Sequence, residues 1–266
     1  MKRLIPPILF VSLCINGCGS TSPEKNNAKT PTVQEDSDNL DAPSSESDLR
    51  PLDPAETHEG DDTPTEPIDF TTVGVPCEPG PTCRGEQYPQ WSLQDFQPLS
   101  PLFGEYYGLE QFDGTVTLVS LHAAWCSYCR TQALHMDQMW KELLDEGFEI
   151  QFVTVNKDNA AEQNYRSWML YEHDEEGNQI FDEEGNPIFR CTYPLLQDTP
   201  EDGVWALHGG NKDDFYIYNV DGTLALYLPA GGDISTRLST EAGYDNLKSA
   251  LIWVLAGENP ADEVSQ

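Results

Sequence analysis

The feature that most constrains the fold is a pair of cysteines placed between a strand pattern and a helix pattern. Residues 116–124 form a run of β-branched and aliphatic side chains long enough for a buried strand. Cys126 and Cys129 follow at once, and apolar residues then recur at helical spacing as far as Glu146. Residues 148–155 give a second strand pattern. This order predicts a βαβ unit, which closes right-handed with parallel strands.

The remaining elements extend this unit to a whole domain. We expect a helix over residues 160–170 and two strands over residues 214–228, joined at Asp221-Gly222, which is a strong hairpin signal. A closing helix is predicted over residues 241–256. A βαβ unit, a hairpin and a helix in this order indicate an α/β thioredoxin-like fold with a central mixed sheet flanked by helices. We place this domain at residues 76–258, with a tail over 259–266.

An insertion at residues 172–192 contains an eight-residue segment that occurs twice, at 174–181 and 182–189. Gly-Asn at the turn positions and Ile-Phe after them predict a small hairpin-like structure. The clustered carboxylates could bind calcium, although they lack the alternating ligands and the closing Glu of an EF-hand loop. A solvated decoration is the simpler interpretation.

The cysteine pair itself points to redox chemistry. At the start of a helix, free N–H groups and the positive end of the dipole stabilise a thiolate, so Cys126 is the expected attacking sulfur. Cys129 lies one turn later and is the expected resolving sulfur. A zinc site and a static disulfide are the alternatives, but no second CxxC motif or Cys/His pair lies at ligand spacing. We therefore expect neither a metal nor a cofactor.

Two histidines are candidates for proton transfer or for lining the substrate groove. His122 precedes Cys126 by four residues on the predicted strand, and His208 lies in a later loop. A partly buried structural role is the alternative for both.

The chain begins with a charged start and a short apolar run that ends at Ile15-Asn-Gly-Cys18. The run is too short to span a bilayer comfortably, which favours a secretory signal over an uncleaved anchor helix. The ending resembles a bacterial lipobox, so residues 1–17 are expected to be a lipoprotein signal peptide and Cys18 the lipidated residue. Cys14 is a poorer candidate because Leu13 is large. Residues 18–75 are predicted to be a disordered acidic tether.

This start places the chain outside the cytoplasm, where disulfides persist. Cys77 and Cys83 flank a turn-forming spacer and are expected to form a structural disulfide, for which Cys191 could compete. The formal net charge of −32 argues against a nucleic-acid partner, because a phosphate backbone repels an acidic surface.

Around the cysteine pair the sequence resembles the amino-terminal domain of the selenoprotein P family, within the thioredoxin-like superfamily. The similar segments are residues 90–95 (QWSLQD), 116–121 (VTLVSL), 202–207 (DGVWAL) and 211–218 (NKDDFYIY). The resemblance runs from about Cys83 to Pro229. It implies that Cys126 stands where the family has selenocysteine, which predicts similar redox chemistry with a slower nucleophile.

The sequence departs from familiar patterns in two ways. The histidine-rich and selenocysteine-rich carboxy-terminal region of that family has no counterpart, so selenium delivery is not expected. Most thioredoxins also place a cis-proline opposite the cysteine pair, whereas the corresponding loop here, residues 208–213, contains no proline. The substrate groove is therefore expected to differ from that of a general disulfide reductase.

We predict a lipid-anchored thiol-disulfide oxidoreductase that faces the periplasm or the cell surface, with the outer membrane favoured. Its expected partners are protein or small-molecule disulfides, and the membrane through Cys18. Two alternatives stay open: a thiol peroxidase that reduces hydroperoxides with the same cysteines, and a surface lipoprotein that only binds.

Overall fold

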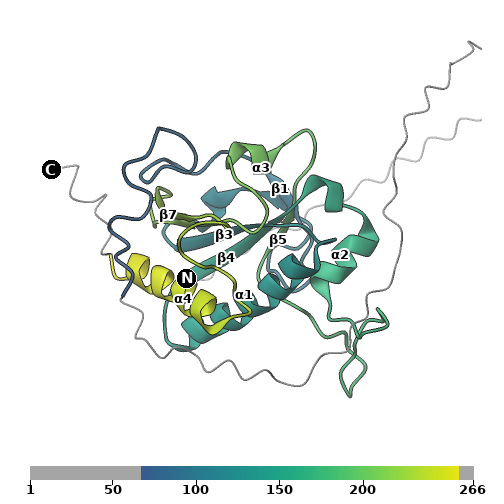
Figure 1. Cartoon of the computed structure of the whole chain (residues 1–266). Helices are drawn as coiled ribbons and strands as arrows, with labels where there is room; N and C mark the ends of the chain where they lie inside the picture. Colours follow the sequence, from purple (N-terminus) through teal and green to yellow (C-terminus); the bar gives the residue numbers. More distant parts are fainter. Residues whose placement is uncertain (1–66, 258–266) are drawn as a thin grey trace, which may run out of the picture. The chain divides into compact units, whose positions relative to one another are not determined.

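The computed structural model describes residues 67–257 (Figure 1). The predicted signal peptide, Cys18, the predicted tether as far as residue 66 and the predicted tail at 259–266 lie outside the described residues. Within them, a seven-stranded mixed sheet has the order β2-β1-β5-β4-β3-β6-β7. Helices cover both faces of this sheet, and the predicted α/β thioredoxin-like fold is confirmed.

The βαβ unit has the predicted topology. Strand β3 (Val116–His122) and strand β4 (Ile150–Asn156) are parallel and are connected by helix α1 (Ser127–Asp145). Every residue of β3 is buried, as its continuous apolar pattern requires. The cysteine pair thus lies where the central strand ends and α1 begins.

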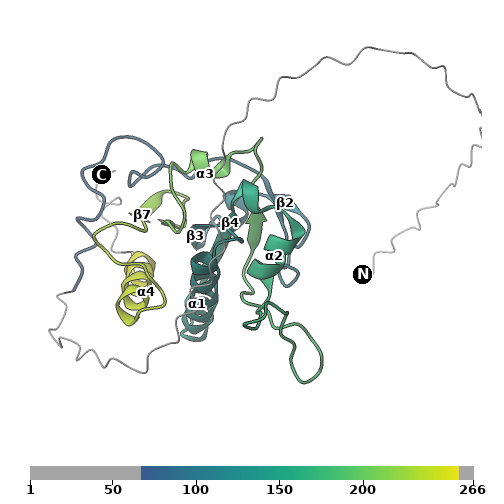
Figure 2. The same ribbon diagram turned by 45° about the vertical axis from the view of Figure 1, so that its right-hand side comes forward.

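The predicted hairpin and closing helix are also present. Strands β6 (Phe215–Tyr218) and β7 (Leu224–Leu228) form the hairpin, and β6 pairs antiparallel with β3. Helix α4 (Glu241–Leu255) packs beside α1 on one face of the sheet (Figure 2). The predicted second helix is shorter than expected, with a 3-10 turn at Asp158–Ala160 before α2 (Gln163–Leu170).

The short elements escaped sequence analysis. Strands β1 (Leu93–Asp95), β2 (Tyr106–Tyr107) and β5 (Leu195–Gln197) extend the sheet on the β4 side. Helix α3 (Val204–Leu207) covers the face of the sheet opposite α1 and α4. Each has at most four residues, too few to display a periodicity.

The folded part begins earlier than predicted. Residues 67–75 were expected to belong to the tether, but Phe70 is buried and packs near Trp253 of α4. The Arg84 guanidinium donates hydrogen bonds to the carbonyl oxygens of Phe70 and Val73. One aromatic residue and a distant arginine therefore dock a stretch whose composition by itself suggests disorder.

The insertion consists of two consecutive turns with the same geometry. The Asp174 carboxylate accepts from the Asn178 N–H, and Asp182 accepts from Asn186 in the same way, both at 2.7 Å. The acidic side chains thus stabilise their own turns. Among residues 67–257, the structure contains no helix that is both long and apolar enough to cross a bilayer.

Candidate active site

Cys126 is the N-cap residue of α1. Its backbone is extended, with φ −88° and ψ 118°, and its Sγ accepts a hydrogen bond from the Cys129 N–H at 3.4 Å. The sulfur therefore takes the place that a serine or aspartate oxygen usually takes at a helix start. A negative charge on this sulfur is stabilised both by the N–H group and by the helix dipole.

Lys212 brings a positive charge to the same sulfur. Its Nζ lies 3.1 Å from Cys126 Sγ and belongs to the loop that precedes β6. The loop reaches this place because β6 pairs with β3, and because the Asp213 N–H donates to the Leu121 carbonyl oxygen at 2.7 Å. An ammonium group this close to a thiolate forms a charge-assisted hydrogen bond.

These contacts make the two sulfurs chemically unequal. Burial opposes ionisation of Cys126, but hydrogen bonds from Cys129 and Lys212 outweigh it, and the pKa of Cys126 is lowered. The pKa of Cys129 is raised by burial, by the negative charge of Asp213 and by its hydrogen bond to Cys126. Cys126 is 8 % exposed and Cys129 is 0 % exposed, so the more acidic thiol is also the more accessible one.

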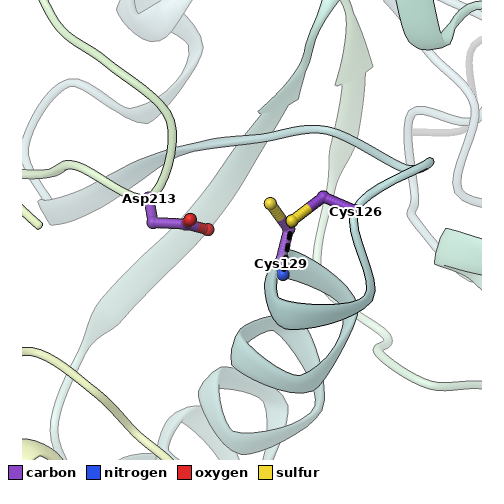
Figure 3. A group of neighbouring side chains, drawn as sticks. All are labelled: Cys126, Cys129 and Asp213. Atoms are coloured by element: carbon purple, nitrogen blue, oxygen red, sulfur yellow. Dashed lines mark hydrogen bonds between the residues drawn. The ribbon is translucent and has the colours of Figure 1, made fainter. Parts of the chain in front are cut away.

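Asp213 faces both sulfurs from the opposite side (Figure 3). One of its carboxylate oxygens and the two Sγ atoms all lie within 4.8 Å of one another. The Asp213 carboxylate also has a positively charged neighbour in Lys212, whose Nζ lies 3.6 Å from Oδ2. The site therefore contains two thiols, an ammonium group and a carboxylate.

Asp214 fixes the loop that carries these two groups. Its Oδ2 accepts from the Asn211 N–H and from the Tyr227 hydroxyl, each at 2.7 Å, and its Oδ1 accepts from the Ala230 N–H at 2.9 Å. The three neighbouring residues thus have distinct tasks: Lys212 contacts Cys126, Asp213 faces both thiols, and Asp214 holds the backbone.

The two candidate histidines lie on opposite faces of the sheet. His122, at the end of β3, is fully buried, and its Nε2 lies 3.8 Å from Asp213 Oδ1. His208 instead packs against Tyr216 and Tyr218, in the core cluster on the other face. Since side chains alternate along β6, those tyrosines point away from the face that carries the cysteines.

His208 is a structural residue in this arrangement. Its Nε2 accepts from the Trp91 indole N–H at 3.3 Å, and its Nδ1 pairs with the Tyr218 hydroxyl at 3.2 Å. Both ring nitrogens are engaged within the core, so the structure gives His208 no part in proton transfer or in the groove. The sequence offered no means of telling the two sheet faces apart at this loop.

The other cysteines lie outside the reactive cluster. Cys77 and Cys83 form a disulfide near the start of the folded part, with an S–S distance of 2.04 Å. Cys191 is a fully buried free thiol next to Gln97, and burial raises its pKa. Cys191 therefore does not compete for the Cys77–Cys83 bond.

The cluster of Cys126, Cys129 and Asp213 has donor types that could surround a metal ion. Lys212, however, already presents a cation to Cys126 at hydrogen-bond distance. A second cation at this sulfur would meet electrostatic repulsion. The arrangement suits proton and thiolate chemistry better than metal coordination.

Sequence reasoning located the cysteine pair and the loop opposite it, but not the roles of Lys212 and Asp213. A signal was present, because residues 212–215 (KDDF) lie in one of the four segments that carry the family resemblance. What that segment does became visible only when the loop was placed against α1.

A mixed sheet with a CxxC pair at the start of the helix that follows its central strand defines the thioredoxin-like class. The family can be named as well. The family model "Selenoprotein P, N terminal region" matches residues 79–230, and this chain belongs to that family.

Individual relatives agree with this assignment. Selenoprotein P of Rattus norvegicus is 30% identical over 149 residues, which are 56% of this chain and 32% of the relative. Selenoprotein P of Homo sapiens is 29% identical over 144 residues, 54% of this chain and 31% of the relative. The chain thus spans about a third of the length of these curated relatives.

Solved structures give more distant likenesses. A putative thiol:disulfide interchange protein DsbE from Chlorobium tepidum has a TM-score of 0.44 and 18% identity, covering 63% of this chain and 97% of that one. An uncharacterized conserved protein from Geobacillus kaustophilus has a TM-score of 0.45 and 16% identity, covering 66% and 84%.

Proposed function

We propose that this protein is a thiol-disulfide oxidoreductase in which Cys126 attacks and Cys129 resolves. The observation that carries the proposal is the environment of Cys126 Sγ, which has a helix N–H at 3.4 Å and the Lys212 ammonium at 3.1 Å. A thiolate is the attacking species in disulfide exchange, and these contacts stabilise it. A merely structural cysteine needs no such contacts.

The proposed substrate is a protein or small-molecule disulfide. The Cys126 thiolate attacks one sulfur of the substrate and forms a mixed disulfide, and the other substrate sulfur leaves. Cys129, the nearest thiol, then displaces the second substrate sulfur and closes the Cys126–Cys129 disulfide. Trp125 beside the site is 42 % exposed, which leaves an apolar surface for the substrate to contact.

The test uses the whole reduced chain and its Cys126→Ser and Cys129→Ser variants, mixed with the small disulfide dithiodipyridine. We expect Cys126→Ser to lose exchange, and Cys129→Ser to stop as a mixed disulfide that peptide mass mapping locates on Cys126. Cys191→Ala is the matched control for the third free thiol within residues 67–257 and should exchange normally. Full exchange by Cys126→Ser would contradict the proposal.

The same variants test the peroxidase alternative. With hydrogen peroxide in place of the disulfide, Cys129→Ser should accumulate a sulfenic acid on Cys126 if that chemistry operates. Turnover of peroxide that is much faster than exchange would reassign the activity. If the protein reacts with neither reagent, the remaining alternative is a surface lipoprotein that only binds.

We further propose that the protein is held at a bacterial membrane through lipid on Cys18, facing the periplasm or the cell surface. The support is the sequence of residues 1–18 alone. Mass spectrometry of the mature amino terminus should find lipid on Cys18. Cys18→Ala should release the protein from membranes and the matched Cys14→Ala should not. A free terminus elsewhere would defeat this assignment.

A further inference from the structure

The Asp213 carboxylate has an unusual environment for a buried charged group. It is 4 % exposed, and its Oδ1 has no hydrogen-bond partner. Buried carboxylate oxygens normally accept hydrogen bonds, because an unpaired buried acceptor is costly. Oδ1 lies 3.8 Å from His122 Nε2, and one carboxylate oxygen lies within 4.8 Å of both sulfurs, so the Cys129 thiol is a potential hydrogen-bond donor to this carboxylate (Figure 3).

The backbone at Asp213 holds this orientation in a conformation that is unfavourable for a residue other than glycine. Its φ is +70°, and within residues 67–257 no other residue apart from glycine has a positive φ. Such conformations are uncommon outside glycine and are often found at functional sites. The N–H of Asp213 donates a hydrogen bond to the Leu121 carbonyl oxygen. The next residue, Asp214, is held by a hydrogen bond from the Tyr227 hydroxyl.

Cys129 needs a proton acceptor when it reacts. It is completely buried, so bulk water does not reach its sulfur. Burial, Asp213 and Cys126 all raise its pKa, and the thiol stays protonated at neutral pH. A thiol is a poor nucleophile, so its proton must leave as the sulfur attacks. A facing carboxylate with a free acceptor site meets this requirement.

We propose that Asp213 is the proton acceptor for Cys129 in the resolving step of disulfide exchange. The inference rests on the proposed function and assigns a second catalytic group to the same site. Lys212 and Asp213 thus divide the chemistry: the ammonium stabilises the attacking thiolate, and the carboxylate activates the resolving thiol.

The step balances as follows. The mixed disulfide joins Cys126 to one half of the substrate, and Cys129 carries its proton. That proton moves to the Asp213 carboxylate while Cys129 Sγ bonds to Cys126 Sγ. The bond between Cys126 and the substrate breaks, and the substrate leaves as a thiolate. The two protein sulfurs are oxidised to a disulfide, the substrate disulfide is reduced to two thiolates, and the proton remains on Asp213 until solvent takes it.

Asp213→Asn is the informative variant. Asparagine has the same shape, accepts a proton far less readily, and tolerates a positive φ at least as well as aspartate. The fold should therefore survive. Asp221→Asn is the matched control, since Asp221 is an exposed turn aspartate of the same hairpin.

The experiment follows thiol release from dithiodipyridine by the reduced whole chain in a stopped-flow instrument. A variant lacking both Cys126 and Cys129 supplies the background from other thiols. Wild type and Asp221→Asn should release two equivalents in one phase. Asp213→Asn should release the first at a similar rate and the second at least about tenfold more slowly. Acid quenching between the phases should trap the adduct on Cys126.

The pH profile separates proton transfer from a loss of packing. In Asp213→Asn the second phase should accelerate steadily with rising pH, because hydroxide replaces the missing base, whereas wild type should level off. Other titratable groups lie around the carboxylate and contribute to the pH dependence of both proteins. They are Cys126, Cys129 and Tyr128 at the start of α1, His122 on β3 and Lys212 on the loop.

Two equivalents released in one phase by Asp213→Asn would overturn the proposal while leaving the oxidoreductase function intact. Equal slowing of both phases without a change in pH profile would likewise overturn it, in favour of a structural role. Failure of wild type to release any thiol above background would instead refute the proposed function itself.

Discussion

At the scale of single residues, the site depends on a few contacts that make two chemically identical cysteines behave differently. Cys126 is the helix N-cap and contacts Lys212, whereas Cys129 is buried and faces Asp213. With only two residues between them, one sulfur lies in a cationic environment and the other lies beside a carboxylate. This asymmetry gives each cysteine its proposed role.

Replacing Lys212 by methionine should make Cys126 less acidic. The hydrogen bond to a charged group is lost, so the pKa of Cys126 should rise, and because the lysine side chain is 39% exposed, solvent screening limits the effect. Alkylation of Cys126 by iodoacetamide near neutral pH should slow by up to about tenfold. Lys141→Met, which removes the same charge further along α1, is the control. Unchanged alkylation in Lys212→Met would contradict the assigned contact.

His122 should make the fold sensitive to acid. Burial lowers its pKa to about 4, although Asp213 opposes this shift. In the unfolded chain His122 binds a proton below its ordinary pKa of about 6.5. In the folded chain it binds that proton only near pH 4. Stability due to this residue is complete above pH 6.5 and falls as the pH drops toward 4, by at most about 1.4 kcal/mol per pH unit.

The variant His122→Leu tests this expectation. It removes the titrating group and two buried ring nitrogens that lack hydrogen-bond partners. Urea unfolding should give equal or greater stability near neutral pH and a shallower loss toward pH 4 than in wild type. The difference between the two proteins isolates His122 from other acidic groups. Parallel pH curves would show that His122 does not titrate as stated.

At the scale of elements, the candidate active site is assembled where one end of a strand, the start of a helix and a loop meet. Strand β3 supplies His122, the start of α1 supplies the cysteines, and the loop before β6 supplies Lys212 and Asp213. The antiparallel register of β6 against β3 aligns that loop with the helix start. The glycine at position 210 assists this close packing, because a Cβ there would lie only 1.8 Å from the Tyr216 hydroxyl oxygen.

The loop depends on Asp214, so Asp214→Ala should damage both stability and function. It leaves the backbone N–H groups of Asn211 and Ala230 without their acceptor. Losing such a buried network should lower the free energy of unfolding by about 2–4 kcal/mol. Disulfide exchange should slow as well, because Lys212 and Asp213 lose their fixed backbone.

Urea unfolding and dithiodipyridine exchange measure the two effects. Asp221→Ala is the control, since its carboxylate also accepts hydrogen bonds in this hairpin but from an exposed turn. It should cost no more than about 1 kcal/mol and leave exchange unchanged. If Asp214→Ala behaved like this control, Asp214 would have no anchoring role.

At the scale of the whole molecule, residues 67–75 at the start of the described domain form a strap that packs against the closing helix α4. Phe70 packs near Trp253, Arg84 holds the strap by its carbonyl groups, and the Cys77–Cys83 disulfide closes the loop between them. The Cys126–Cys129 pair and the Cys77–Cys83 disulfide therefore lie in separate parts of the domain.

Replacing both Cys77 and Cys83 by serine should lower the free energy of unfolding by about 2 kcal/mol, because the unfolded chain gains the freedom of an open loop. Exchange at Cys126 should change by less than about twofold, since none of its contacts involves this disulfide. Thermal unfolding and the stopped-flow assay measure both quantities. Loss of exchange in a variant that still folds would place the pair in the redox site.

Much of the fold could be predicted from sequence because its main elements carry local signals. The continuous apolar run of β3, the helical periodicity after Cys129 and the turn at Asp221-Gly222 each reflect the geometry of one segment. The place of Cys126 at a helix start follows from the same local pattern. The sequence by itself therefore determined the βαβ unit, the hairpin, the closing helix and the position of the cysteine pair at a helix start.

Tertiary structure decided which groups surround that pair. Lys212 lies 86 residues from Cys126, and their contact exists only because β6 pairs with β3 in one register. The same register sends His208 to the far face and leaves His122 beside Asp213. Periodicity records which side of an element is buried, but not which distant side chain meets it. The partners of the thiols were therefore settled by packing, which alone joins residues far apart in the chain.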